Sequence, residues 1–86
     1  MTKPQLLIVE DDRAISNFIA ATLDTQNYHY QQVKTGSSAL MSALSYRPDI
    51  ILLDLGLPDM EGVEIIQKIR QWSNMPIIVY CSCCCR

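Results

Sequence analysis

A short apolar run followed by an aspartate constrains the fold more than any other part of the sequence. The run Ile50–Leu53 is too short for a buried helix, but it is typical of a strand buried on both faces of a parallel sheet. Asp54 ends this run at the carboxyl tip of the predicted strand, where open α/β sheets place their ligands. Gly56 and Pro58 follow in a loop with little side-chain bulk, so an incoming group can approach the carboxylate closely.

Three further strand-like segments alternate with helical patterns along the chain. Residues 6–9 and 77–80 are continuous apolar runs, and residues 28–33 form a more mixed run that is typical of an edge strand. Between the runs, apolar residues recur at spacings of three and four: Ile15, Phe18, Ile19 and Leu23, then Ala39, Leu40, Ala43 and Leu44, then Val63, Ile65, Ile66, Ile69 and Trp72. The alternation predicts a doubly wound α/β fold, with a parallel sheet and helices on both faces. Trp72 is interpreted as a packing anchor.

Length and charge limit the possible functions. A chain of 86 residues with a net charge of -2 and a pI near 5.1 has no basic field, so we expect no direct contact with nucleic acid. The longest apolar runs are far below the roughly 20 residues of a membrane helix, and no signal-like segment begins the chain. The sequence therefore predicts a cytoplasmic protein that does not contact a membrane.

Acidic residues follow two of the predicted strands. Glu10, Asp11 and Asp12 come directly after residues 6–9, and Asp54 follows the later apolar run. If these strands are neighbours, the carboxylates share one crevice, where two of them about 4 Å apart repel by roughly 4 kcal/mol. Oxygen ligands favour Mg²⁺ as the compensating cation. The chemistry indicated is phosphoryl transfer onto or past an aspartate.

Simpler interpretations of these acids remain open. Asp54 alone could cap a turn, and the three earlier acids could cap a helix and oppose its dipole, a role that suits Asp12 best. A haloacid-dehalogenase-type phosphatase is excluded because it needs a second aspartate two residues after the first, where this chain has Gly56. A dinucleotide-binding fold is excluded because no glycine-rich loop follows the first predicted strand.

Two of these stretches together resemble the receiver domain of two-component response regulators. They are residues 7–12 (LIVEDD) and residues 49–62 (DIILLDLGLPDMEG). The resemblance covers roughly residues 4–80 and implies a flavodoxin-like (CheY-like) fold, here with four strands in the order 2-1-3-4 and three helices. Within this family, residues 54–59 and 70–73 are most similar to a transcriptional regulator of potassium uptake.

The resemblance also implies roles for individual residues. Asp54 would accept a phosphoryl group from the phosphohistidine of a sensor histidine kinase. Glu10, Asp11, Asp54 and the backbone carbonyl of Gly56 would hold Mg²⁺. The domain would be a phosphoacceptor rather than an enzyme, and its only catalysis would be the transfer to and from its own aspartate.

The carboxyl-terminal part departs from the family pattern. We expect residues 1–80 to form an incomplete receiver domain and residues 81–86 (CSCCCR) to be an aberrant cysteine-rich tail. The family's Ser or Thr falls on Cys81, and none of the lysines (Lys3, Lys34 and Lys68) is expected after a strand on the side of the acids. Residues 77–80 would then be an exposed edge that favours a homo-oligomer. Two functions remain: an impaired phosphoacceptor, or an inert or interaction-only fragment that self-associates.

Overall fold

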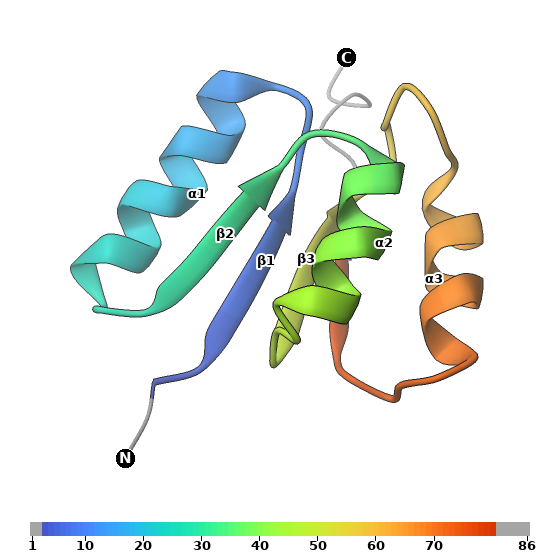
Figure 1. Cartoon of the computed structure of the whole chain (residues 1–86). Coiled ribbons are helices and arrows are strands. Elements are labelled where there is room, and N and C mark those ends of the chain that lie inside the picture. The colour runs from blue at the N-terminus through green and yellow to red at the C-terminus, as the bar shows by residue number, and fades with distance from the viewer. Residues whose placement is uncertain (1–2, 81–86) are drawn as a thin grey trace.

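Strands and helices alternate in the computed structural model, which describes residues 3–80 (Figure 1). The elements are β1 (Gln5–Val9), α1 (Arg13–Thr25), β2 (His29–Val33), α2 (Gly36–Ser45), β3 (Ile50–Asp54), α3 (Gly62–Arg70) and β4 (Ile77–Tyr80). The strands pair in parallel in the order β2-β1-β3-β4. This confirms the predicted doubly wound, flavodoxin-like sheet of four strands and three helices.

Helices cover both faces of the sheet. Successive strand residues point to opposite faces, so a continuous apolar strand presents apolar side chains on both sides that helices can bury. Figure 1 shows α1 on one side and α2 with α3 on the other. Leu6 and Ile8 of β1 pack toward α1, whereas Leu7 and Val9 pack toward α2 and α3. Residues of α2 and α3 complete the larger core: Ala39, Ala43, Ile65 and Ile69.

Local side-chain hydrogen bonds fix where two helices begin. The Asp12 carboxylate accepts the backbone N–H groups of Ala14 and Ile15 at 2.9 and 3.3 Å, which caps α1 as predicted. Thr35 caps α2 in the same way through the N–H of Ser38 at 3.1 Å. These caps place the amino ends of both helices at the carboxyl edge of the sheet.

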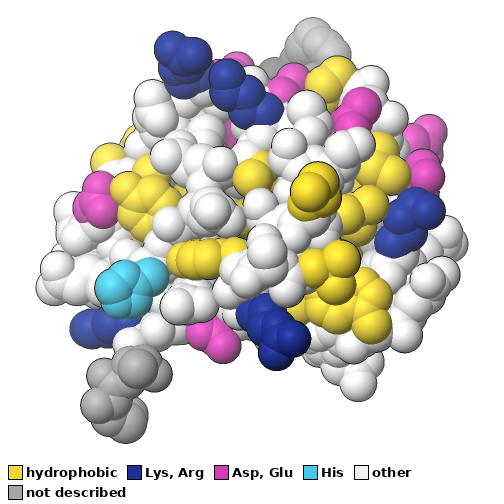
Figure 2. Space-filling view, in the orientation of Figure 1, with side chains coloured by type: hydrophobic (Ala, Val, Ile, Leu, Met, Phe, Trp, Pro, Cys, Tyr) yellow, Lys and Arg dark blue, Asp and Glu magenta, His cyan; other side chains and the backbone are white. Residues whose placement is uncertain are grey.

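The sequence pattern overestimated the apolar surface that the helices bury. Helix α3 ends at Arg70, and Trp72 is 44% exposed and lines a cavity of about 490 Å³, so its interpretation as a packing anchor was wrong. Phe18, Leu44 and Val63 also fit the helical pattern but are exposed. Apolar side chains are visible on the surface that carries α2 and α3 (Figure 2). Amphipathic spacing therefore gave the helix type correctly but not the width of each buried face.

The expected cysteine-rich tail, residues 81–86, and the comparison of Cys81 with a family Ser or Thr lie outside the described residues. Within residues 3–80, no helix has the length and apolar character required to cross a bilayer.

Candidate functional site

The tips of three adjacent strands carry polar side chains on one face of the sheet. β1 pairs with β3 up to Val9 and Leu53, so that Glu10 and Asp54 come next on these neighbouring strands. β3 pairs with β4, and Asp54 lies opposite Tyr80. By strand alternation these side chains share the face of Ile8, which is the face covered by α1.

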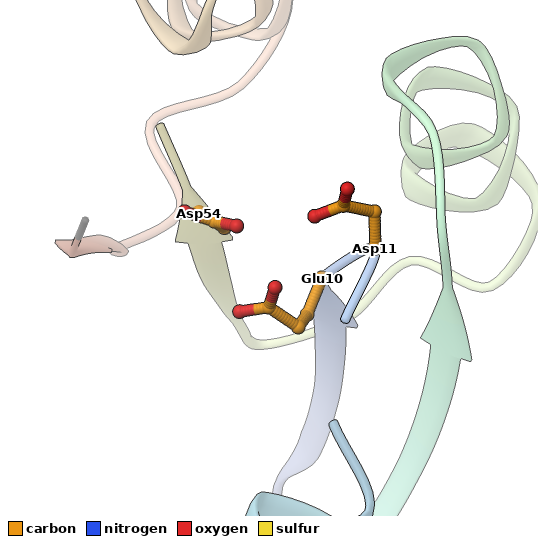
Figure 3. Close-up of side chains that lie close together, drawn as sticks. All are labelled: Glu10, Asp11 and Asp54. Carbon is orange, nitrogen blue, oxygen red and sulfur yellow. The ribbon is translucent and has the colours of Figure 1, made fainter. Parts of the chain in front are cut away.

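The predicted acidic residues converge at these tips. One carboxylate oxygen from each of Glu10, Asp11 and Asp54 lies within 4.8 Å of the others, and Figure 3 shows the three side chains around a common space. Glu10 and Asp54 are buried, at 1% and 0% exposure, whereas Asp11 is exposed. The cluster therefore has a buried base and one side that is open to solvent.

Glu10 is held by hydrogen bonds to both of its carboxylate oxygens. Oε2 accepts the backbone N–H of Asp12 at 3.1 Å, and Oε1 accepts the hydroxyl of Tyr80 at 2.8 Å. Burial raises the pKa of the Glu10 carboxyl, as does the nearby Asp54, while the two hydrogen bonds lower it. Burial and the bond to Glu10 raise the pKa of the Tyr80 hydroxyl, so this group remains a donor at neutral pH.

Asp54 lies at the start of a short loop. Its Oδ1 accepts the backbone N–H of Gly56 at 3.0 Å, which directs the carboxylate along the beginning of that loop. Pro58 follows, and the loop then reaches α2, where Asp59 accepts the N–H groups of Gly36 and Ser37 at 2.8 and 3.2 Å. The loop that borders the cluster is therefore fastened to the neighbouring helix.

Sequence reasoning missed two cationic side chains near the acids. Arg13 and Lys34 line a pocket of about 190 Å³ together with Glu10 and Asp11. Lys34 follows β2 directly, so the expectation that no lysine follows a strand on the side of the acids was wrong. The position of Lys34 directly after residues 28–33 could have indicated this, because the carboxyl ends of parallel strands share one edge of the sheet.

The donor set fits a hard divalent cation. All three side chains offer oxygen, and two buried carboxylates so close together are unfavourable without a compensating charge. Opposed ligands of Mg²⁺ are about 4.2 Å apart, twice its usual bond length. The oxygens of the cluster all lie within 4.8 Å of one another, which is of the same order as this spacing.

Comparisons with known proteins agree with this architecture. KdpE, the KDP operon transcriptional regulatory protein of Escherichia coli, is 43% identical over 74 residues, which are 86% of this chain and 33% of KdpE. The response regulator ArlR of Staphylococcus aureus is 43% identical over 75 residues, which are 87% of this chain and 34% of ArlR. This chain thus spans about a third of the length of these relatives.

A solved structure and a family profile give the same assignment. The chemotaxis response regulator CheY4 of Vibrio cholerae is 30% identical and superposes with a TM-score of 0.85, over 91% of this chain and 68% of CheY4. Residues 6–83 match the profile of the response regulator receiver domain. The match extends over most of the chain and includes the strand tips that carry the acidic cluster. The chain therefore belongs to the receiver-domain family of two-component response regulators.

Proposed function

We propose that this chain accepts a phosphoryl group on Asp54 from a phosphohistidine of a sensor histidine kinase, with Mg²⁺ held at the acidic cluster. The observation that carries the proposal is the meeting of Glu10, Asp11 and Asp54 oxygens within 4.8 Å at the tips of adjacent strands. In this assignment Glu10 and Asp11 bind the cation directly or through water. Asp54 and the backbone carbonyl of Gly56 complete the set of ligands.

The transfer requires an oxygen of Asp54 to reach the phosphorus atom. A phosphorus–oxygen bond to the carboxylate forms while the phosphorus–nitrogen bond of the phosphohistidine breaks, and the electron pair returns to the imidazole nitrogen. Mg²⁺, when bound, offsets the negative charge of the carboxylates and of the incoming phosphoryl oxygens. The chain itself supplies the nucleophile and its orientation, since the Gly56 N–H holds Oδ1 of Asp54.

The surroundings of Asp54 support its role as the acceptor. Asp54 is fully buried beside the exposed Asp11, and the next two positions are Leu55 and Gly56. The glycine keeps side-chain bulk away from the carboxylate, so a phosphoryl group can approach from the open side of the cluster. Arg13 and Lys34 line the adjoining pocket, and their positive charge favours an anionic donor there.

Mass measurement of the intact protein tests the proposal. The chain is incubated with a small acyl phosphate or phosphoramidate and Mg²⁺, and we expect a gain of one phosphoryl group. Asp54→Asn should abolish the gain, and Glu64→Gln, which changes an exposed acid of α3 outside the cluster, should not. A gain that persists in Asp54→Asn, or no gain in the unmodified chain, would contradict the assignment.

The sequence resemblance within the family supports a more specific proposal. We infer that the full-length protein regulates transcription of potassium-uptake genes and that its kinase resembles KdpD. KdpE and ArlR are equally similar in overall identity. The support for this proposal is the sequence resemblance of residues 54–59 and 70–73 to KdpE. Phosphotransfer rates from purified KdpD and from unrelated sensor kinases would test this, with a clear preference for KdpD expected.

A second candidate function is self-association without phosphorylation. Within residues 3–80 the outer edge of β4 pairs with no strand, and Ile78 and Val79 are 54% and 40% exposed. An exposed apolar edge is a template for pairing with a second copy of the chain. Light scattering in reductant tests this: a monodisperse monomer would exclude it, whereas a dimer that takes up no phosphoryl group would favour it.

A further inference from the structure

We propose that Tyr80 is a positioning residue of the acidic cluster, whose hydroxyl holds the Glu10 carboxylate in the orientation that binds a divalent cation. The inference rests on the proposed function, because it concerns the same Mg²⁺ site. It adds a residue from a third strand to a site that sequence reasoning built from two segments.

Strand register brings Tyr80 to this position. Tyr80 lies opposite Asp54 across the β3–β4 pair, and the backbone N–H of Leu55 donates to the Tyr80 carbonyl at 2.9 Å. Its side chain extends across the tip of β3, on the face covered by α1, to the tip of β1. There the hydroxyl donates to Oε1 of Glu10 at 2.8 Å. The two bonded residues are 70 positions apart in the sequence.

The hydrogen bonds of Glu10 leave it able to bind a cation. Each carboxylate oxygen has two lone pairs, and the known bonds use one on Oε1, from Tyr80, and one on Oε2, from the Asp12 N–H. The remaining lone pairs can face the space shared with Asp11 and Asp54. Two donors from different elements therefore fix the plane of the carboxylate before any ligand arrives.

Loss of one of these donors has a defined consequence. Without the Tyr80 hydroxyl, Glu10 Oε1 would lose the donor that comes from β4, and the side chain could rotate away from the cluster. Hydrogen-bond partners that orient metal ligands typically change metal affinity by about 10- to 100-fold when they are removed. In the opposite role, the hydroxyl would occupy an oxygen that the cation needs. Its removal would then raise the Mg²⁺ affinity instead of lowering it.

Calorimetric titration with Mg²⁺ of the unmodified chain and of Tyr80→Phe distinguishes these roles. We expect Tyr80→Phe to weaken Mg²⁺ binding by about 10- to 100-fold. Tyr30→Phe is the matched control, because the Tyr30 hydroxyl donates to the Asp24 carboxylate at 3.0 Å, outside the acidic cluster. Unchanged or tighter binding by Tyr80→Phe would overturn the proposal.

A double-mutant cycle separates positioning from a general loss of packing. In a Glu10→Gln background, Tyr80→Phe should change Mg²⁺ affinity by a much smaller factor than in the unmodified chain, because the carboxylate to be oriented is absent. Equal factors in both backgrounds would show that the hydroxyl does not act through Glu10. Circular dichroism of each variant verifies that it has folded.

The tyrosine absorbance of the unmodified chain provides a second readout of Mg²⁺ binding. Mg²⁺ should perturb the near-ultraviolet absorbance of tyrosine with the same midpoint as the calorimetric titration, and Tyr30→Phe should leave this signal intact. Binding without a tyrosine signal would contradict the role of Tyr80 while leaving the proposed Mg²⁺ site standing. No Mg²⁺ binding by the unmodified chain would instead contradict the proposed function itself.

Discussion

The carboxylate of Asp59 accepts the backbone N–H of Gly36 at 2.8 Å, although the two residues are 23 positions apart. The same carboxylate also accepts the N–H and the hydroxyl of Ser37. An acidic group at the amino end of a helix is favourable because unpaired N–H groups and the positive end of the helix dipole are located there. This contact joins the loop after β3, which begins beside Asp54, to the start of α2.

Asp59→Asn should destabilise the fold in a way that depends on pH. The hydrogen bond from Gly36 lowers the pKa of Asp59, so the group stabilises the folded state above the ordinary pKa of an aspartate. This contribution is lost as the pH falls through the lowered value. Urea unfolding should therefore show a difference between the unmodified chain and Asp59→Asn at neutral pH that disappears in acid.

Glu61→Gln serves as the control for this prediction. Glu61 is two residues away and is the N-cap residue of α3, but its side chain makes no capping hydrogen bond. If Glu61→Gln and Asp59→Asn lose the same stability with the same pH dependence, a general effect of charge would replace the specific contact as the explanation.

Gly36→Ala should destabilise the fold by steric overlap. A Cβ at this position would lie 2.5 Å from Sδ and 2.9 Å from Cβ of Met60, so the loop would have to shift. Overpacking of this kind costs about 1–3 kcal/mol. Thermal unfolding should show that Met60→Ala partly relieves the loss in the double variant. Fully additive effects of the two substitutions would contradict the contact.

Asp54→Asn should stabilise the chain in the absence of divalent cations. Glu10 and Asp54 are both buried with carboxylate oxygens no more than 4.8 Å apart, and two unit charges at that separation repel by about 3.5 kcal/mol at an effective dielectric constant of 20, so a gain of about 1–3 kcal/mol is expected. Denaturant unfolding with chelator measures the gain, and exposed Glu64→Gln is the control. Saturating Mg²⁺ should raise the stability of the unmodified chain more than that of Asp54→Asn. A destabilised Asp54→Asn would refute the charge argument.

Asp11 and Asp12 should differ in the property that each controls. Asp12→Ala removes the cap of α1 and should cost about 0.5–2 kcal/mol of stability, with little change in Mg²⁺ affinity. Asp11→Ala should weaken Mg²⁺ binding with little effect on stability. Paired unfolding and calorimetric titrations measure both properties, and a reversed or identical pattern would contradict this division of roles.

The strands and the edge of the sheet at which the acids lie were predictable because they follow from local patterns. Short continuous apolar runs such as Ile50–Leu53 have few alternatives to a buried parallel strand, and their carboxyl ends necessarily share one edge of the sheet. The order of the strands came from the family resemblance. The roles of Glu10, Asp11, Asp54 and Gly56 in binding Mg²⁺ remain predictions.

Contacts that depend on register or on tertiary distance were not predictable. Tyr80 reaches Glu10 only because β4 pairs with β3 so that Tyr80 is opposite Asp54, and no periodicity in the sequence specifies that pairing. The contact of Asp59 with α2 likewise joins two segments that show no shared pattern. Trp72 was misassigned because helical spacing continues past Arg70, where the helix itself ends.

Glu10 directly follows β1 and Asp54 ends β3, and these two strands pair continuously from Leu6 opposite Ile50 to Val9 opposite Leu53. The separation of their backbone positions is therefore governed by the regular interval between neighbouring strands, about 4.8 Å, and the loops that follow contribute only to the orientation of the side chains. Insertions or substitutions in more distant loops can change which molecules approach this chain without altering the spacing of the two strands that carry its central carboxylates. The loops that contact other molecules can consequently vary in sequence while the strands that carry the acidic cluster stay the same.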